Sequence, residues 1–321
     1  MPVFEPLERQ DEWPRRAADL LGGILIDAAF GDPPNSRHPV VLIGRAANLA
    51  RRFAPSGARR RRVYGVGMAV AIPLALAALA RQTERRWPRV LGGRSVAAVA
   101  LIGFASSRRT LLARAREVAD ALDADDLAGA RHLLGYHLVS RDTSALDASE
   151  IAAAAIESVA ENLHDGVLAP WCAAAVAGAP GAWAYRAMNT LDSLWGYHEP
   201  FLEELGMGAA RLDDALNLVP ARLGAAAICI TAPISGGDAG NAWRVWRRDA
   251  WQTLSPNAGH PMAAMAGALG VVLSKRDAYI LCGDGRAATS ADIRRACRIA
   301  DTAAGAVATF LLLAVSAGRR R

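Results

Sequence analysis

Lysine is almost absent from this chain of 321 residues: Lys275 is the only one, and arginine makes up the rest of the 37 basic residues. Aromatic residues are also scarce, at 6% of the composition, although 52% of the residues are hydrophobic. The four cysteines form no Cys-x-x-Cys pair, so neither a zinc site nor a dithiol redox motif is indicated. The apolar residues are mainly Ala, Leu, Val and Gly, a composition typical of closely packed helices.

Several motifs of well-known enzyme classes are missing as well. No Gly-x-x-x-x-Gly-Lys-Ser/Thr sequence occurs, so a nucleotide cannot be held by a classical P-loop. The dinucleotide-binding fingerprint, the His-Glu-x-x-His zinc motif and the Gly-x-Ser-x-Gly nucleophile elbow are absent too. Strand signals are nearly absent, because apolar and polar residues rarely alternate and β-branched clusters are scarce. The sequence therefore predicts an all-α fold.

Charged residues are missing from six stretches of the chain. The stretches are 63–80, 95–107, 166–185, 223–237, 258–274 and 302–318. At about 1.5 Å per residue, the longer ones reach roughly 25–30 Å, enough to cross the hydrocarbon core of a bilayer. They predict a polytopic integral-membrane helical protein with about four to six membrane-embedded helices. A soluble, alanine-rich helical protein with fully buried core helices is the alternative on composition alone.

Two features refine this membrane interpretation. The stretch 166–185 contains Gly178, Pro180 and Gly181, which predict a broken or re-entrant pair of helical segments. Six arginines lie in 51–62, directly before an apolar stretch. Arginine clusters in such a position indicate contact with anionic membrane lipid rather than with nucleic acid. We therefore expect a multi-pass protein of the cell membrane.

Carboxylates concentrate on one predicted helix in the middle of the chain. Asp147 and Glu150 have the spacing of an N-cap residue and its partner, which predicts a helix over 148–165 that ends at Gly166. At 100° per residue, four carboxylates fall within roughly 80° of one another: Glu150, Glu157, Glu161 and Asp165. Like charges at this spacing repel, yet no lysine or arginine occurs from 142 to 185. The face is predicted either to be solvated or to bind Mg²⁺, which prefers carboxylate oxygens.

A second group of polar residues lies on the two helices that follow. It consists of Asn189, Asp192, Ser193, Tyr197 and His198 at the end of one helix, and Arg211, Asp213, Asp214, Asn217 and Arg222 in the next. The spacing of Asp213, Asp214 and Asn217 puts all three on one helix face. Helix capping explains one or two of these residues. So many polar groups beside apolar segments indicate a functional site.

A third element is the sequence Ser-Pro-Asn-Ala-Gly-His-Pro from Ser255, followed directly by an apolar helix. Two prolines, Asn257 and a glycine predict a rigid turn at a helix N-terminus, where free backbone N–H groups can hold an anion. An ordinary N-cap loop is the alternative. Further turns are predicted from Gly31 to His38 and at 283–286.

Taken in order, these segments resemble the CobD/CbiB family, the adenosylcobinamide-phosphate synthases of cobalamin biosynthesis. The matching sequences are GDPPNSRHPVVLIG from Gly31, SRDTSALDASEIAAAAIESVAENLHDGVLAP from Ser140, AYRAMNTLDSLWGY from Ala184, ARLDDALNLVPARL from Ala210, SPNAGHPMAAMAGALGV from Ser255 and GDGR from Gly283. Together they span nearly the whole chain, which predicts an N-terminal extension at 1–17 and a single membrane domain at 18–321.

The resemblance implies an acid–amine ligase that uses ATP and Mg²⁺. The acceptor would be adenosylcobyric acid, a corrinoid, and the amine (R)-1-amino-2-propanol or its O-phosphate. The product would be adenosylcobinamide or its phosphate. Because a carboxylate is a poor acyl donor, it must first be activated. Phosphoryl transfer then needs a metal held by carboxylates, and cations that stabilise the developing charge.

The same resemblance suggests which residues form the site. The candidate catalytic residues are Glu157, Glu161, Asp165, Asp192, Asp213 and Asp214, with Glu157, Glu161 and Asp165 as the predicted magnesium ligands. The candidate substrate- and phosphate-binding residues are Arg141, Asp142, Thr143, Asn162, Asn189, Arg211, Asn217, Arg222, Ser255, Asn257 and His38. The arginines suit phosphate because the guanidinium group can pair with it through two hydrogen bonds.

Two other functions are consistent with parts of the sequence. A membrane prenyltransferase would use Asp213 and Asp214 as an Asp-rich motif, but it needs a second such motif on a facing helix. A membrane transporter would explain charges near membrane segments and a broken helix. A transporter should also show two related halves in its hydropathy, and this sequence shows no such symmetry.

Overall fold

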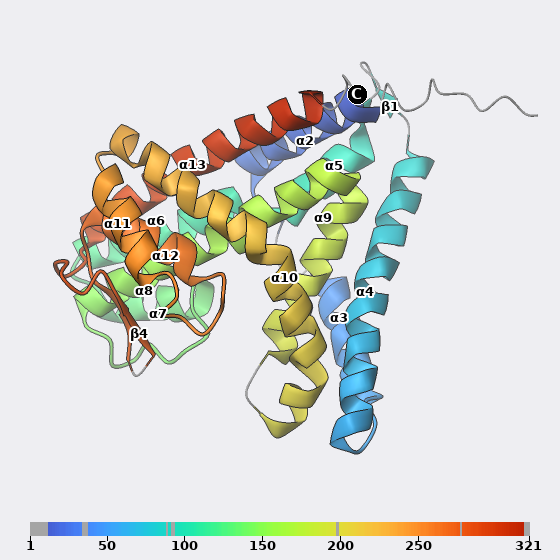
Figure 1. Cartoon of the computed structure of the whole chain (residues 1–321), viewed down its shortest axis with the longest axis horizontal. Coiled ribbons are helices and arrows are strands. Elements are labelled where there is room, and N and C mark those ends of the chain that lie inside the picture. Colours follow the sequence, from blue (N-terminus) through green and yellow to red (C-terminus); the bar gives the residue numbers. More distant parts are fainter. Residues whose placement is uncertain are drawn as a thin grey trace, which may run out of the picture. The chain divides into compact units, whose positions relative to one another are not determined.

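The structure is a computed structural model that describes residues 12–33, 38–87, 89–90, 94–196, 199–276 and 278–317. These residues are almost entirely helical, which confirms the all-α prediction (Figure 1). They form two compact units. The first contains the described residues up to Ser107, then Ala169–Leu216 and the described residues from Ala308, and the second contains those of Arg108–Leu168 and Asn217–Val307. The helices α10 (Pro200–Thr231) and α13 (Ser290–Ala317) each continue from one unit into the other. The proposed extension at 1–17 and single domain at 18–321 stay predictions.

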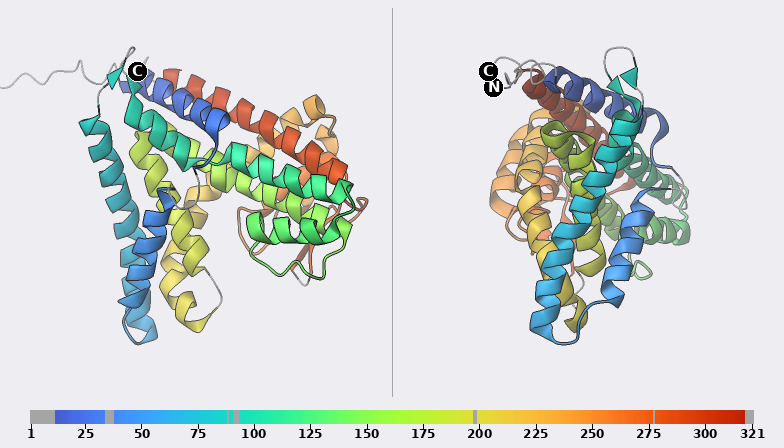
Figure 2. Two further views of the ribbon diagram at one scale, coloured as in Figure 1. Left: turned by 180° about the vertical axis from the view of Figure 1, so that it is seen from behind. Right: turned by 90° about the vertical axis from the view of Figure 1, so that its right-hand side faces the viewer.

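The first unit is built from long helices. They are α2 (Glu12–Phe30), α3 (Val40–Arg52), α4 (Ala58–Arg86), α5 (Val96–Ala105), α9 (Ala169–Trp195) and the first half of α10, with a two-stranded turn of β1 (Arg89–Val90) and β2 (Arg94–Ser95). Within this unit, α2 lies along α5, while α3 and α4 lie along α9 (Figure 2).

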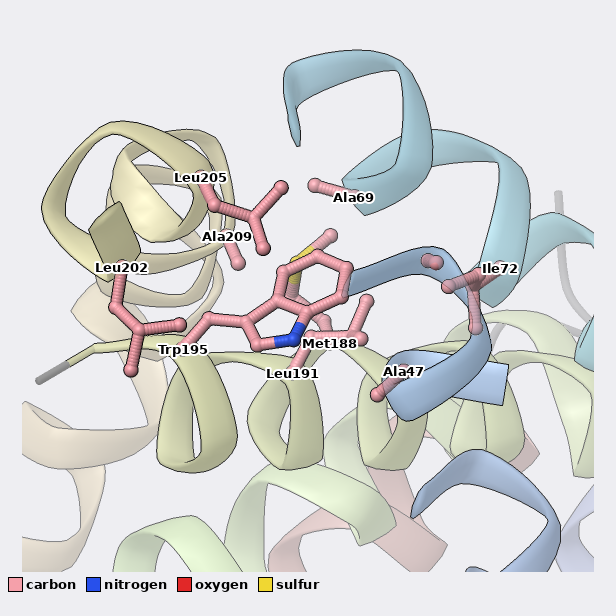
Figure 3. Close-up of a cluster of buried hydrophobic side chains, with 10 residues drawn as sticks. Ala47, Ala69, Ile72, Met188, Leu191, Trp195, Leu202, Leu205 and Ala209 are labelled. Atoms are coloured by element: carbon pink, nitrogen blue, oxygen red, sulfur yellow. The ribbon is translucent and has the colours of Figure 1, made fainter. Parts of the chain in front are cut away.

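The core of the first unit centres on Trp195 at the end of α9. Trp195 belongs to a buried cluster that also contains Leu202 and Leu205 of α10 and Ile72 of α4 (Figure 3). The backbones of α4 and α10 approach each other at Gly65, where a Cβ atom would lie 2.1 Å from the carbonyl oxygen of Leu205. Only glycine permits that contact.

The predicted break in α9 is present. Ala177 has φ −131° and Gly178 has φ 68° and ψ −161°, both outside the helical region. The backbone conformation of Gly178 is essentially restricted to glycine, and Pro180 then starts the second half of the helix.

The second unit combines shorter helices with one hairpin. Its elements are α6 (Arg108–Asp123), α7 (Leu127–His137), α8 (Ala148–Leu163), the π-helical turn η2 (His164–Leu168), the second half of α10, the 3-10 turn η3 (Ala232–Ser235), α11 (Ala239–Asp249), α12 (Gly259–Leu269), β3 (Leu273–Lys275), β4 (Tyr279–Leu281) and most of α13. In the antiparallel hairpin, Lys275 is opposite Tyr279. α12 packs against α11, and α8 packs against α12 and β3 (Figure 1).

The start of α8 is as predicted, but its end is not. Asp147 and Glu150 form a capping box with both hydrogen bonds present. Gly166 does not end the helix, because it lacks the positive φ that a glycine at a helix C-terminus adopts. The chain instead passes through the wider turn η2 directly into α9. Single π-helical turns of this kind are frequent at functional sites.

Five helical segments among the described residues are long and apolar enough to cross a membrane. They are Ala58–Arg86, Val96–Asp123, Ala148–Trp195, Phe201–Ser235 and Ser290–Ala317. This finding confirms the predicted polytopic membrane protein. The apolar stretch 258–274 is an exception, since its helix α12 has only 11 residues, and all of them are buried.

Candidate functional site

The acidic face of α8 holds a buried ion pair in the second unit. Glu157 is only 6% exposed, and its Oε2 lies 3.3 Å from Nη2 of Arg141. Its other carboxylate oxygen, Oε1, is buried and has no hydrogen-bond partner in the described part of the chain. Buried polar atoms are nearly always paired, so this oxygen marks a place where a ligand can bind. The alternative of a solvated acidic face is wrong for Glu157.

The β3–β4 hairpin supplies two further neighbours of Glu157. Lys275 acts on Glu157 through its charge, and the Tyr279 hydroxyl donates a hydrogen bond to the Glu157 carboxylate. Burial raises the pKa of Tyr279 well above its usual range, and the negative charges of Glu157 and Glu161 raise it further. The phenol therefore keeps its proton at neutral pH and remains a hydrogen-bond donor beside the carboxylate.

The other two predicted magnesium ligands lie one and two turns further along the chain. Glu161 is partly buried on α8, and Asp165 lies in η2, where its Oδ1 is 2.8 Å from Nε2 of His164. No three His, Cys, Asp or Glu side chains in the described ranges are grouped to hold one metal ion.

Magnesium is commonly held by one or two protein carboxylates together with water and substrate phosphates. The unpaired oxygen of Glu157, next to Glu161, fits that set of donors. The magnesium site of Glu157, Glu161 and Asp165 stays a prediction.

A pocket of about 740 Å³ lies beside this ion pair. Its polar lining comes from Arg141, Asp142 and Glu150 near the start of α8, Gln252 after α11, and Lys275, Arg276 and Tyr279 in and next to the hairpin. Arg141 and Tyr279 both line the pocket and both interact with Glu157. The pocket and the buried carboxylate therefore belong to one site.

The loop before α8 is held by its own side chains. Asp142 accepts hydrogen bonds from the backbone N–H of Ser144 at 2.9 Å and from its hydroxyl at 3.0 Å, which lower the pKa of Asp142. The Thr143 hydroxyl donates to the carbonyl of Arg131 at 2.9 Å. On α8, the Asn162 side chain donates to the carbonyl of Ser158 at 2.9 Å. These bonds fix the local fold, and substrate binding by Asp142, Thr143 and Asn162 stays a prediction.

The turn before α12 brings together residues that are far apart in sequence. Oγ of Ser255 accepts from the backbone N–H groups of Asn257 and Ala258 at 3.3 and 3.4 Å. The buried Asn257 side chain accepts from Nη1 of Arg222 at 3.3 Å. Asn217, which precedes Arg222 by about one and a half turns of α10, is also buried. The Ser255 hydroxyl therefore stabilises the turn through its backbone, while Asn257 positions the Arg222 guanidinium beside it.

His260 lies directly after this turn, and its hydrogen bond with Trp246 determines which ring nitrogen carries the proton. Nε1 of Trp246 donates to Nδ1 of His260 at 2.9 Å. An indole N–H is only a donor, so Nδ1 carries no proton and Nε2 does. That Nε2 is buried and has no hydrogen-bond partner among the described residues. Burial, followed by the positive charge of Arg222, lowers the pKa of His260 to about 4, so the ring is a neutral donor at neutral pH.

The remaining candidates belong to the first unit. They are His38, Asn189, Asp192, Arg211, Asp213 and Asp214. Nδ1 of His38 accepts from the backbone N–H of Val40 at 3.1 Å, and Asn189 donates to the buried Asp213 at 3.5 Å. The structure thus pairs two of the predicted residues on α9 and α10. Tyr197 and His198 lie outside the described residues.

The sequence did not predict four residues of the site in the second unit. They are His164, His260, Lys275 and Tyr279. His164 is next to Asp165 in the sequence, whereas His260, Lys275 and Tyr279 reach the site by folding, since each is about a hundred residues or more from Glu157 along the chain. Lys275 alone carried a signal in the sequence, as the single lysine of an arginine-rich chain.

Comparison with known proteins assigns the chain to a family. The family model described as CobD/Cbib protein matches residues 20–300. The cobalamin biosynthesis protein CobD of Mycobacterium tuberculosis is 42% identical over 312 residues, which cover 94% of this chain and 97% of that protein. The protein of the same name from Geobacter metallireducens is 39% identical over 82% of this chain and 82% of its own length. The one from Dehalococcoides mccartyi is 40% identical over 83% of this chain and 86% of its own length. No solved structure matches the chain.

Proposed function

Because the chain belongs to the CobD/CbiB family, we propose that it is a membrane enzyme of cobalamin biosynthesis that forms an amide bond. The bond would join adenosylcobyric acid to (R)-1-amino-2-propanol or to its O-phosphate, in a reaction that uses ATP and Mg²⁺. The product would be adenosylcobinamide or its phosphate. Membership of the family favours this function over a membrane transporter or an Asp-rich-motif prenyltransferase.

The reaction has two chemical steps. An oxygen of the corrinoid carboxylate attacks the γ-phosphorus of ATP, and ADP leaves. The amine nitrogen then attacks the acyl carbon, loses a proton, and phosphate leaves as the amide forms. The first step concentrates negative charge on the transferred phosphoryl group, so the site must supply cations and a place for the metal.

The observation that carries the proposal is the buried Glu157 with one unpaired oxygen beside Arg141. Glu157 holds the Arg141 guanidinium in place, which leaves other N–H groups of Arg141 to bind a phosphate in the pocket. Glu157 and Glu161 would hold magnesium, which neutralises charge on the phosphates. The phenol of Tyr279 keeps a donor beside the same carboxylate.

A second set of donors supports binding of an anionic oxygen in this unit. His260 presents a buried, neutral Nε2–H group, and Arg222 is fixed nearby by Asn257. Both are positioned before any ligand arrives, and preorganised donors stabilise developing negative charge more effectively than mobile ones.

The test is a reaction with the purified protein in detergent. Adenosylcobyric acid, (R)-1-amino-2-propanol or its O-phosphate, ATP and Mg²⁺ are combined, each is omitted in turn, and products are measured by mass spectrometry. We expect the corrinoid amide to form, together with equimolar amounts of ADP and phosphate. Amide formation without ATP, or none from the complete mixture, would contradict the proposal.

A further inference from the structure

We infer that the pocket between the loop before α8 and the β3–β4 hairpin binds the phosphate group of a substrate, and that Lys275 contacts this phosphate. The inference rests on the proposed function, because it assigns a place to the phosphate which that reaction requires. The shared chemistry is a phosphate group of a small molecule. It is provided either by a nucleoside triphosphate or by the O-phosphorylated amine.

The size of the pocket favours a small ligand. Its volume of about 740 Å³ lies within the range of roughly 300–1,000 Å³ that is typical of sites for small molecules and cofactors. A nucleotide or a phosphorylated aminopropanol fits such a space. A corrinoid with its ring substituents is too large to be enclosed there, so the pocket is not the place for the whole acceptor.

The pocket has more basic than acidic side chains available to a ligand. Three cations line it, and its two acidic side chains already have partners. Asp142 accepts two hydrogen bonds from Ser144, and Glu150 takes part in the capping box of α8. Arg276 is 82% exposed and lies 3.7 Å from Glu150, so these two charges largely offset each other. The cations left for a ligand are Arg141 and Lys275.

Lys275 lines the pocket and belongs to β3, the strand that packs against α8. Its charge acts on both Glu157 and Glu161. It forms no ion pair with either carboxylate in the part of the chain that the structure describes, and its side chain is exposed. The ammonium group can therefore reach a ligand without breaking a salt bridge first.

The carboxylate behind the pocket completes the argument for a ligand. The side chain of Glu157 is more than nine-tenths buried, and its Oε1 has no partner among the described residues. The charges of Arg141 and Lys275 favour the ionised carboxylate, but a buried oxygen without a hydrogen-bond partner is still costly. A phosphate brought with its own cation would satisfy Glu157, Arg141 and Lys275 together.

Lysine suits this position in a way that arginine does not. Its ammonium group is compact and sits on a flexible stem, so it can follow a phosphate through a reaction, whereas the guanidinium group binds as a rigid fork. All other basic residues of the chain are arginines. The single lysine also provides a chemical probe, since its side chain is the only primary amine apart from the N-terminus.

The experiment measures acetylation of Lys275 in the full-length protein in detergent. An N-hydroxysuccinimide ester of acetic acid is the reagent, mass spectrometry of the Lys275 peptide is the readout, and the N-terminal amine is the internal reference. The probes are a non-hydrolysable ATP analogue with Mg²⁺, isopropyl phosphate as an amine-free form of the phosphorylated amine, and adenosine as the phosphate-free control.

We expect one phosphate-bearing probe to slow acetylation of Lys275 at least about fivefold, and adenosine to have no effect. Protection by the ATP analogue assigns the pocket to the nucleotide. Protection by isopropyl phosphate alone assigns it to the phosphorylated amine. Protection by neither at saturating concentration, or equal protection by adenosine, overturns the inference.

Three variants provide an independent measurement. Lys275→Gln should raise the KM for the phosphate-bearing substrate about tenfold, which corresponds to about 1.4 kcal/mol of binding. Lys275→Arg keeps the charge and should recover part of the loss. Arg247→Gln removes an exposed cation of α11 that does not line the pocket, and should leave the KM unchanged. An unchanged KM in Lys275→Gln overturns the inference.

The two proposals fail in different ways. If wild-type protein forms no amide, the proposed function fails, while protection of Lys275 can still be measured. If wild-type protein forms the amide but Lys275 is neither protected nor needed, only the phosphate site is wrong.

Discussion

At the scale of single residues, the ion pair of Glu157 and Arg141 is asymmetric. Glu157 is buried, whereas the Arg141 side chain is 29% exposed and lines the pocket. Loss of the arginine would leave a buried carboxylate without compensation, while loss of the carboxylate leaves an arginine that water can still solvate. Substitution at Glu157 therefore tests function with little effect on folding.

We predict that Glu157→Gln lowers the rate of amide formation about 100-fold or more, the effect typical of losing a group that acts on transition-state charge. Thermal stability should change by no more than about 1 kcal/mol, because glutamine keeps the size and one acceptor of the side chain. Turnover under saturating ATP and Mg²⁺ and the thermal midpoint in detergent are the measurements.

The control is Glu117→Gln, which removes a partly exposed carboxylate of α6 that pairs with Arg114. Its turnover should equal that of the wild type. Glu161→Gln should lose turnover like Glu157→Gln, and it also removes a repulsion between the two carboxylates. Full activity in both α8 variants would remove this helix from the mechanism and direct attention to Asp192, Asp213 and Asp214.

The pH dependence of stability is expected to depend on His260. Burial and the charges of Arg222 and His164 lower its pKa from 6.5 to about 4 in the folded protein. Between these two values the unfolded chain binds the extra proton and the folded chain does not. The free energy of unfolding therefore falls as the pH is lowered through this window.

We predict that His260→Gln makes the thermal midpoint less dependent on pH between about 6.5 and 4. The midpoint is measured at half-unit intervals in detergent. His132→Gln, which removes an exposed histidine of α7, is the control and should keep the wild-type slope. An identical slope in His260→Gln would mean that the imidazole is protonated in the folded protein as easily as in the unfolded chain.

At the scale of helices, local sequence rules worked where the cause is local. Asp147 and Glu150 predicted the start of α8, and Gly178 with Pro180 predicted the break in α9. The end of α8 was predicted wrongly, because Gly166 ends a helix only if its surroundings give it a positive φ. No pattern near Glu157 could reveal Lys275, since only the packing of the hairpin on α8 brings the two together.

The break in α9 leads to a prediction about backbone conformation. Gly178→Ala should destabilise the protein by about 1–3 kcal/mol, because alanine is strained at φ 68° and ψ −161°. Crowding does not contribute, since the nearest atom to a Cβ there is Cδ of Pro180 at 3.6 Å.

Gly44→Ala in α3 is the matched variant. A Cβ at this position has no atom within 4 Å, and the site is helical, so the substitution should be neutral or stabilise by about 0.5–1 kcal/mol. Both variants are compared by thermal unfolding in the same detergent. Equal stability of the two variants would show that α9 does not need its break.

At the scale of the whole molecule, the composition predicted the class of protein and the resemblance predicted its family, but neither could place the candidate residues. The structure divides them between the two units, with Glu157 and Arg222 in the second and Asp213 in the first. The presence of several helices that could cross a membrane was predictable, because charge-free runs and helix length are properties of the sequence. The pocket was not, because three separate segments form it.

The surface of α4 gives the strongest physical reason to expect a membrane environment. Val63, Val70 and Leu74 are exposed on this helix, and its middle contains no charged residue that could interrupt the apolar surface. Water would be an unfavourable neighbour for so continuous an apolar surface, whereas lipid chains solvate it without cost. Four further segments have the length and hydropathy to cross a bilayer.

We therefore predict that the protein stays in the membrane fraction after washing with alkaline carbonate and requires detergent for extraction. Carbonate removes proteins held by charge, so it would release the chain if its arginine clusters were the only attachment to lipid. Segments that span the bilayer should resist it, because their release would expose apolar surface to water at roughly 25 cal/mol per Å², and the described residues contain five segments long and apolar enough to span it. The measurement is immunoblotting of pellet and supernatant, with a peripheral membrane protein as the control that must be released. Recovery of this chain in the carbonate supernatant as a monomer would contradict the membrane assignment.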